Sequence, residues 1–293
     1  MSAGRLAPTP SGELHLGNLT AFYAAWLSAR QSGARLLLRM EDVDTGRTRP
    51  DVEARQREVL QWFGIDWDSE TQRQSERDYS EWIAALGDHA YWCACSRKAL
   101  KAAGGLCAAG CAGSGLTMGA LRFAATSDIV RVYDRRHGPS DISADVHHHP
   151  ILVRADGLVA YPLAVVVDDI RDGVTQVVRG DDLLSFSAPQ EQLWRAFGAT
   201  PPTWLHTPLV VGADGRKLSK SHGSVDIATL RSCGWQREDL RQLVGSWLGV
   251  PTADLAEAVS AWRPTGALSG AIHVLTDGSE GPKGLTWRTG PLE

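Results

Sequence analysis

The chain has 293 residues, is 43% hydrophobic and 22% charged, and carries a formal net charge of −4. Its length is ample for one catalytic core and for little beyond it. The weakly acidic balance argues against a general nucleic-acid coat, because phosphate contacts need clustered Lys and Arg, although a local basic patch would still bind one structured RNA. Without a run of eighteen apolar residues or a signal-peptide pattern at the start, we expect a cytoplasmic protein that does not contact a membrane.

A short turn near the N-terminus has the residues of a phosphate-binding site. In His15-Leu16-Gly17-Asn18, Gly17 lets the backbone approach an anion closely, and the periodic run 19–27 predicts a helix whose positive end faces that anion. The side chains of His15 and Asn18 can donate hydrogen bonds to phosphate oxygens. This turn therefore predicts one half of an ATP site.

Strands and helices alternate along the chain. Apolar runs predict buried strands, and periodic stretches bounded by Pro or Gly predict helices. In chain order these are a strand at 36–40, a helix from Pro50 to Gly64, strands at 158–167 and 174–178, and a helix at 188–197. This alternation predicts an α/β fold with a Rossmann-like, doubly wound parallel sheet, whose nucleotide site lies at the carboxyl ends of the strands. A generic domain of this kind with an unrelated use is the alternative.

Residues 91–150 interrupt the alternation and contain four of the five cysteines, Cys93, Cys95, Cys107 and Cys111. Ser96 can cap a short helix at 97–103, and Gly104-Gly105 then turns the chain back, which would bring the two cysteine pairs together. Four thiolates satisfy a tetrahedral zinc ion, so we predict one structural Zn²⁺ per chain. The Cys-x-Cys spacing is tighter than in the commonest zinc ribbon, and a disulfide or inert cysteines are the alternatives.

The same segment holds two clusters of polar residues. Three consecutive imidazoles, His147 to His149, do not converge easily on one ion from a strand, because strand side chains alternate between faces. A solvated loop is the better interpretation. Arg135-Arg136-His137 predicts a solvated turn, with contact to an RNA backbone as the alternative.

The loop Lys217-Leu218-Ser219-Lys220-Ser221 lies about two hundred residues after the glycine turn. Its lysines, Lys217 and Lys220, add positive charge opposite that turn, and Ser219 adds a hydroxyl. Either half alone is a common pattern. The pair, in this order and spacing, predicts a split site for the triphosphate of ATP.

The end of the chain divides into a helical part and a part without periodicity. A helix at 238–248 fits a stem-contacting region at 222–263, which would complete a catalytic core of residues 1–263. From residue 264 to 293 the chain is rich in Gly, Ser and Thr, which predicts a disordered tail.

The two phosphate signatures resemble those of the class I aminoacyl-tRNA synthetases, a His-x-Gly-His turn and a Lys-Met-Ser-Lys-Ser loop. Asn18 replaces the second His with a donor of similar reach, and Leu218 is a conservative exchange for Met. The resemblance covers roughly residues 4–262 and extends to the glutamyl branch. Segments 5–15, 38–44, 161–169 and 178–182 look like the amino-acid site of that branch. The resemblance implies ATP, with Mg²⁺, and L-glutamate as substrates.

A pocket for free glutamate needs two cationic anchors and one anionic anchor, because glutamate carries two carboxylates and one ammonium. Arg5 and Arg179 present planar guanidinium groups that bind carboxylates in pairs of hydrogen bonds. The family roles place Arg5 and Tyr161 on the γ-carboxylate, Arg179 on the α-carboxylate, and Glu41 on the amino group. Ala7, Thr9 and Ser11 complete the predicted set. Taken singly, each residue also fits a surface ion pair or a packed tyrosine.

A short subfamily of the glutamyl branch has a zinc cluster with the spacing Cys-x-Cys and then Tyr-x3-Cys. Cys107 stands where that subfamily often has Tyr, and a thiolate is at least as good a zinc ligand. Its members place the anticodon arm of tRNA(Asp) in the catalytic cleft. Because 72 residues follow Ser221, we expect no anticodon-binding domain here either.

The resemblance therefore implies a monomeric, ATP-dependent ligase that forms glutamyl-adenylate without tRNA and transfers glutamate to queuosine at the wobble position of tRNA(Asp). His15 and Lys220 would stabilise the departing pyrophosphate. A truncated glutamyl-tRNA synthetase that charges a 3′ adenosine is one alternative. A non-catalytic glutamate- or RNA-binding paralogue is the other, and the intact His15, Glu41 and Lys220 argue against it.

Overall fold

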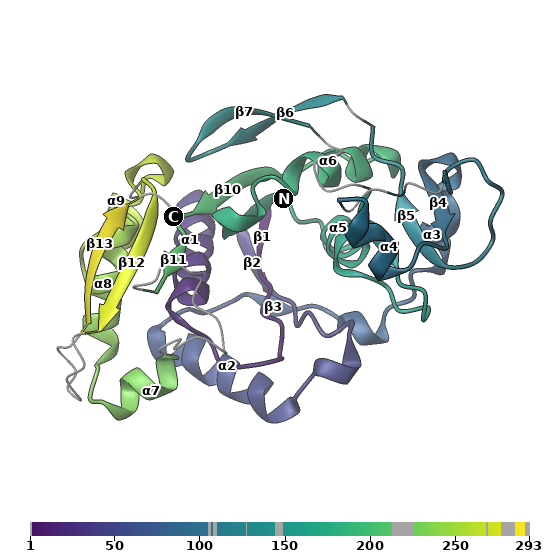
Figure 1. Cartoon of the computed structure of the whole chain (residues 1–293). Helices are drawn as coiled ribbons and strands as arrows, with labels where there is room; N and C mark the ends of the chain where they lie inside the picture. Colours follow the sequence, from purple (N-terminus) through teal and green to yellow (C-terminus); the bar gives the residue numbers. More distant parts are fainter. Residues whose placement is uncertain are drawn as a thin grey trace.

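The centre of the molecule is a seven-stranded sheet in the order β3-β2-β1-β9-β10-β6-β7 (Figure 1). The computed structural model describes residues 2–104, 107, 110–126, 128–143, 149–212, 226–267, 269–276 and 285–290. Neighbouring strands are parallel except for the last pair, β6 and β7. The strands are β1 Ala3–Leu6, β2 Arg35–Leu38, β3 Ser69–Glu70, β6 Ile129–Asp134, β7 Gly138–Ser143, β9 Gln176–Gly180 and β10 Thr203–Thr207. The sheet grows in one direction from β1 to β3 and in the other from β9 to β10, so the predicted doubly wound α/β fold is confirmed.

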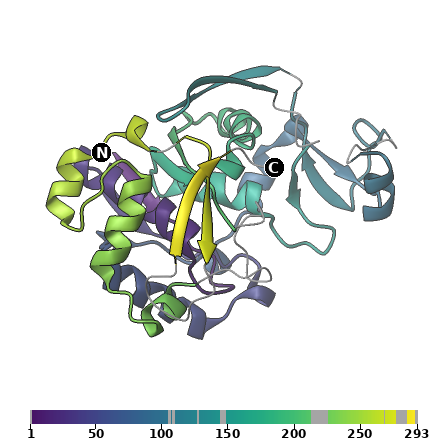
Figure 2. The ribbon, with the colours of Figure 1, turned by 60° about the vertical axis from the view of Figure 1, so that its left-hand side comes forward.

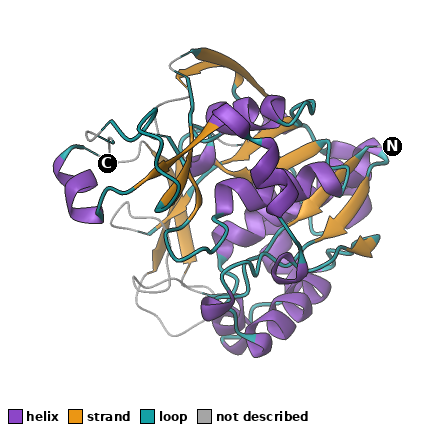
Figure 3. Cartoon of the chain, turned by 90° about the vertical axis from the view of Figure 1, so that its right-hand side faces the viewer, coloured by secondary structure: helices purple, strands orange, loops and turns teal. Residues whose placement is uncertain are grey.

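Helix α1 packs against β1, β2, β9 and β10 of this sheet, and α6 packs against β6 and β7 (Figure 3). The helices of the described residues are α1 Leu16–Ser32, α2 Pro50–Phe63, α3 Ser80–Ala85, α4 Arg97–Ala102, α5 Tyr161–Arg171, α6 Ser187–Ala196, α7 Ile227–Ser232, α8 Arg237–Trp247 and α9 Leu255–Ala261. Side chains of a strand alternate between faces. Leu36 and Leu38 of β2 accordingly join the core that α1 completes, whereas Leu37 joins a second core with Val177 and Ala188. Both faces of the parallel centre of the sheet are therefore buried, whereas β6, next to the edge strand β7, alternates exposed and buried residues.

Local signals placed several helices correctly. The predicted helix 50–64 is α2, with Pro50 at its first position and Gly64 ending it in the left-handed conformation at φ 98°. The predicted helices at 188–197 and 238–248 are α6 and α8. Ser96 caps α4, since its side chain accepts a hydrogen bond from the N–H of Ala99.

The prediction of a strand at 158–167 is wrong, because most of this run belongs to helix α5. Every residue from Leu163 to Asp169 is buried, including two aspartates, so the middle of this helix has no solvent-exposed face. A fully buried helix and a buried strand both appear in the sequence as an uninterrupted apolar run. Pro162, in the first turn of α5, is the local feature that favours a helix.

The segment 91–150 contributes to two sheets rather than forming one separate unit. Strands β4 Ala90–Cys93, β5 Ala120–Phe123 and β8 Ile151–Val153 make a small antiparallel sheet. The hairpin of β6 and β7 instead extends the central sheet, where β6 pairs with β10. The segment thus reaches the edge of the catalytic core.

The C-terminal part contains strands where the sequence predicted a disordered tail. A short 3-10 helix at Pro264–Gly266 is followed by β12 Ala271–Thr276 and β13 Leu285–Gly290, which form an antiparallel hairpin (Figure 2). β12 also pairs with β11, Val210–Val211, about sixty residues earlier. Ile272 is fully buried. These strands could not be predicted from the local composition, because β12 pairs with β11, which is remote in sequence. No helix within the described ranges is long and apolar enough to cross a membrane.

Candidate active site

A cavity of about 370 Å³ opens at the carboxyl ends of β1, β2, β9 and β10. It lies where the two halves of the sheet meet, which is the usual ligand site of a doubly wound fold. Most of the predicted site residues line it, namely Arg5, Ala7, Thr9, His15, Gly17, Asn18, Glu41, Tyr161 and Arg179. Ser11 is not among the residues that line it, and its backbone N–H donates to the carbonyl of Thr9 at 2.8 Å. Lys217, Ser219 and Lys220 lie outside the described residues.

The glycine turn forms the first turn of α1. The backbone N–H of Asn18 donates to Nδ1 of His15 at 3.3 Å, and Oδ1 of Asn18 accepts from the backbone N–H of His15 at 3.2 Å. A ring nitrogen that accepts carries no proton, so the proton of a neutral His15 lies on Nε2. A Cβ atom on Gly17 would lie 3.1 Å from the His15 ring. The turn therefore favours glycine at this position, and the start of α1 can present donor groups of the kind that a phosphate site requires.

Arg5 and Glu41 both line the cavity. Arg5 lies in β1, where its Nε contacts Asp169 at 3.3 Å and its Nη1 donates to the carbonyl of Val178 at 3.1 Å. Glu41 follows β2 and is 9% exposed. Burial raises the pKa of the Glu41 carboxyl, and the charges of Arg39 and Arg5 oppose this effect.

Arg179 lies at the end of β9 and is fixed by neutral groups. Its Nε donates to Nε2 of His206 at 3.0 Å, its Nη1 to Gln190 at 2.6 Å, and its Nη2 to the hydroxyl of Ser187 at 2.8 Å. The guanidinium also lies 4.5 Å from the centre of the Trp204 ring. Burial lowers the pKa of Arg179 to about 10, so the side chain stays charged at neutral pH.

His206 was not predicted as a site residue. It is fully buried in β10, its Nδ1 lies 2.8 Å from the carboxylate of Asp134, and burial lowers its pKa to about 4. A neutral ring that donates from Nδ1 to Asp134 offers Nε2 as the acceptor for Arg179. A single histidine in an apolar strand carries no sequence signal for this role.

Residues 135–137 form a turn, as predicted, and His137 is exposed, whereas the side chain of Arg136 is covered rather than solvated. The side chain of Arg136 is 6% exposed and contacts Asp181 at 3.4 Å, and Nε2 of His137 lies 2.6 Å from the same carboxylate. His147 and His148 lie outside the described residues. The hydroxyl of Tyr91 lies 2.9 Å from Nδ1 of His149.

The four cysteines of the predicted zinc site lie together. Their sulfur atoms are all within 4.8 Å of one another, and Cys93 and Cys111 are buried. Cys107 lies 3.6 Å from Cys93 and 3.5 Å from Cys95, and Cys95 lies 3.8 Å from Cys111. Four sulfurs at about 2.3 Å from a tetrahedral zinc ion would be about 3.8 Å apart, whereas a disulfide needs about 2.05 Å. The cysteines are free thiols and fit a metal ion.

Comparison with known proteins agrees with this geometry. The chain matches the family of class I tRNA synthetases (E and Q), catalytic domain, over residues 3–107 and 119–267. It is 43% identical over 228 residues to the glutamyl-Q tRNA(Asp) synthetase of Xanthomonas oryzae, which covers 75% of this chain and 76% of that protein. It is 38% identical over 297 residues to the protein of the same name from Nocardia farcinica, covering 94% and 93%.

Among solved structures, the glutamate-tRNA synthetase of Elizabethkingia anophelis has the same fold, with a TM-score of 0.75 at 24% identity. The match covers 93% of this chain and 68% of that structure. The family match extends over most of the chain and includes every predicted residue of the ATP and glutamate sites. The chain therefore belongs to the class I tRNA synthetases, in the branch of the glutamate and glutamine enzymes.

Proposed function

We propose that this protein is an ATP-dependent ligase that activates L-glutamate and transfers it to queuosine at the wobble position of tRNA(Asp). The main support for the proposal is that one and the same cavity is lined by two groups of residues. These are Arg5, Glu41, Tyr161 and Arg179 on the one hand, and His15 at the start of α1 on the other. Family membership supports the ligase chemistry. The name of its relatives, glutamyl-Q tRNA(Asp) synthetase, supports the acceptor.

The charges of the cavity suit free glutamate. Arg179 would bind the α-carboxylate, because the side chains that hydrogen-bond its guanidinium are neutral. Arg5 and the hydroxyl of Tyr161 would bind the γ-carboxylate. Glu41 would accept hydrogen bonds from the α-ammonium. An amino acid without a second carboxylate would leave Arg5 with Asp169 as its anionic neighbour at hydrogen-bond distance within the described part of the chain.

Activation follows from this placement. An oxygen of the glutamate α-carboxylate attacks the α-phosphorus of ATP, a new P–O bond forms, and the bond to the bridging oxygen of pyrophosphate breaks. The enzyme contributes orientation of the two substrates and stabilisation of charge on the departing pyrophosphate. His15, Gly17 and Asn18 at the positive end of α1, with Lys217, Ser219 and Lys220, would bind the phosphates. Mg²⁺ would accompany ATP and reduce the negative charge of those phosphates.

Transfer completes the reaction. A hydroxyl of the queuosine cyclopentenediol attacks the carbonyl carbon of glutamyl-adenylate, an ester forms, and AMP leaves. Bases in an anticodon loop are unstacked easily, so proteins commonly read RNA there. In this proposal residues 1–263 form the catalytic core, and the helical region 222–263 contacts the RNA stem.

A structural zinc ion would be held by Cys93, Cys95, Cys107 and Cys111. Four cysteines leave no open coordination position, so the ion would stabilise the fold of its segment and take no part in the reaction. We further propose that the protein acts as a monomer in the cytoplasm, where these substrates are available.

The decisive experiment separates the two ends of the tRNA. Labelled glutamate is offered with tRNA(Asp) that carries queuosine, with tRNA(Asp) that carries guanosine at that position, and with queuosine-containing tRNA(Asp) that lacks its 3′ adenosine. We expect transfer to survive loss of the 3′ adenosine and to vanish without queuosine. Charging of tRNA(Glu) at its 3′ end would instead identify a discrete glutamyl-tRNA synthetase.

A further inference from the structure

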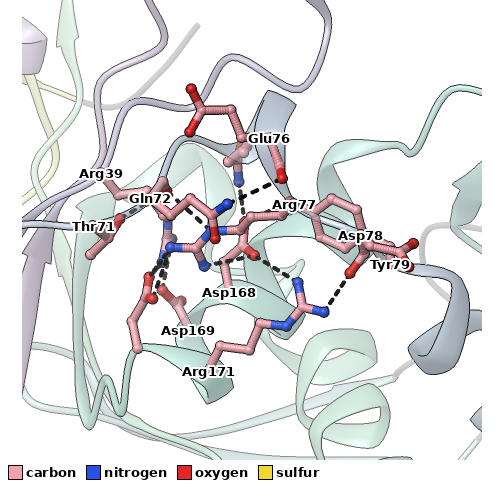
Figure 4. Close-up of polar contacts among 12 residues, drawn as sticks. Arg39, Thr71, Gln72, Glu76, Arg77, Asp78, Tyr79, Asp168, Asp169 and Arg171 are labelled. Atoms are coloured by element: carbon pink, nitrogen blue, oxygen red, sulfur yellow. Dashed lines mark hydrogen bonds and ion pairs between the residues drawn. The ribbon is translucent and has the colours of Figure 1, made fainter.

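Arg39 belongs to a network of buried charges next to residues that line the cavity, and Figure 4 shows the part of this network around Asp168 and Asp169. The side chain of Arg39 is 0% exposed. Its Nη2 lies 2.7 Å from Asp169 and 3.5 Å from Glu41, and its Nη1 lies 3.2 Å from Asp172. One guanidinium therefore holds three carboxylates that come from two different parts of the chain.

Two contacts of this network reach groups that face the cavity. Glu41 lines the cavity and is contacted by Arg39 directly. Arg5 also lines it, and its Nε shares the carboxylate oxygen Oδ1 of Asp169 with Arg39. Arg39 itself is not among the lining residues. It can therefore act on a bound amino acid only through Glu41 and Arg5.

The spacing of these groups depends on Arg39. Glu41 and Asp169 are both buried, and two buried carboxylates repel each other in surroundings of low dielectric. The groups that face Glu41 are Arg39, Arg5, Asp169 and, from the start of α5, Tyr161. Without Arg39, the guanidinium of Arg5 would be the cation left among them. The two carboxylates would then compete for Arg5.

A second arginine offers a matched comparison. Arg77 is 4% exposed and contacts Asp168 and Asp172, each at 2.9 Å (Figure 4). The side chains of Gln74 and Tyr79 also hydrogen-bond Asp168, at 2.8 and 2.9 Å. None of these groups lines the cavity. Arg77 thus resembles Arg39 in burial and in its paired carboxylates, but it contacts neither Glu41 nor Asp169 and is linked to them only through Asp172, which both arginines contact.

We infer that Arg39 is a positioning residue of the glutamate site, which fixes Glu41 and, through Asp169, Arg5 at the separation that free glutamate requires. The inference rests on the proposed function, because it takes glutamate as the ligand of the cavity. Arg39 touches no substrate in this scheme. This role differs from simple stabilisation of the fold, because loss of Arg39 should weaken the binding of glutamate far more than the binding of ATP.

The test compares Arg39→Met and Arg39→Lys with Arg77→Met in glutamate-dependent exchange of pyrophosphate into ATP. For Arg39→Met we expect the KM for glutamate to rise about 10- to 100-fold, because buried carboxylates lose a partner, with the KM for ATP changed much less. Arg39→Lys keeps the charge but loses the planar fork, so its rise should be smaller. Arg77→Met should lower thermal stability and leave the KM for glutamate near that of the wild type.

The pH profile adds a readout that a purely structural residue would not change. The charge of Arg39 opposes the burial that raises the pKa of Glu41. Removing that charge should raise this pKa further, so the acid limb of kcat/KM for glutamate should move to higher pH in Arg39→Met. In Arg39→Lys and Arg77→Met the limb should stay near its wild-type position.

The outcomes separate this inference from the proposed function. Equal effects of Arg39→Met and Arg77→Met on the KM for glutamate and on the pH profile would overturn the positioning role. If Arg39→Met does not fold, Arg39→Lys decides, and an unchanged KM for glutamate would overturn the role in the same way. A wild-type enzyme without any glutamate-dependent exchange, and without glutamate binding by calorimetry, would instead overturn the proposed function.

Discussion

At the scale of residues, the two arginines of the amino-acid site are held in different ways. Arg179 is fixed by His206, Gln190 and Ser187, which are neutral, so no carboxylate is paired with it at hydrogen-bond distance among these contacts. Arg5 instead shares the carboxylate of Asp169. A negative ligand should therefore be attracted more strongly to Arg179. Arg5 should contribute less through its net charge and more through the directed hydrogen bonds that its guanidinium can donate to a planar carboxylate.

The site should discriminate glutamate from glutamine through Arg5. Replacing the γ-carboxylate by a neutral carboxamide removes a charge-assisted pair in a buried place, at a cost of about 2–4 kcal/mol. We expect kcat/KM for activation to favour glutamate accordingly, and we expect Arg5→Ala to remove most of this preference while the KM for ATP changes little. Competition between the two amino acids in pyrophosphate exchange measures the preference. Equal activation of both by the wild type would show that Arg5 does not read the side chain.

The sequence predicts the residues that line the cavity better than it predicts the buried partners that fix those residues in place. The charges of glutamate identify Arg5, Glu41 and Arg179 directly, and all three line the cavity. The partners His206 and Asp169 are 27 and 164 residues away from the arginines that they contact. Only the folded sheet brings such pairs together, so neither composition nor spacing could assign them a role.

At the scale of elements, prediction succeeded where the stabilising signal is local. Helix α2 carries Pro50 at its start and Gly64 at its end, and both features act within a few residues. Helix α5 and strand β12 were missed because their stabilisation is tertiary: the middle of α5 is buried on all sides, and β12 pairs with the distant β11. The cysteine cluster was predicted partly from a local signal. Ser96 caps the short helix α4, which lies between the two cysteine pairs, and the four cysteines lie together in the structure.

The cysteine cluster yields a prediction with an internal control. Cys111→Ser should lower the zinc content from about one ion per chain towards zero and should lower the Tm, because metal binding stabilises the folded segment. Cys233→Ser is the matched control, because Cys233 is a free cysteine outside the cluster. Elemental analysis of protein purified without added metal, with thermal denaturation, checks both effects. Equal zinc content in wild type, Cys111→Ser and Cys233→Ser would rule out a metal at the cluster.

At the scale of the whole molecule, the active site is a product of the topology. The β1 half of the sheet supplies Arg5, Glu41 and the helix end at His15, and the β9 half supplies Arg179. The two halves meet at the parallel pair of β1 and β9, so the residues proposed to bind ATP and those proposed to bind glutamate line one cavity. The doubly wound order was predictable from the alternation of elements. The edge hairpin of β6 and β7 and the C-terminal sheet were not, because both depend on pairings across long stretches of chain.

This arrangement predicts that activation of glutamate does not require RNA. The amino-acid groups and the described half of the phosphate site line one cavity that the protein forms by itself, so binding of tRNA is not needed to bring them together. Glutamate-dependent exchange of pyrophosphate into ATP should therefore proceed without tRNA. His15→Ala should lower its kcat by about ten- to a thousandfold, the usual effect of losing one contact to developing charge. Exchange that appears only when tRNA is added would mean that the RNA completes the site, and would favour a discrete glutamyl-tRNA synthetase.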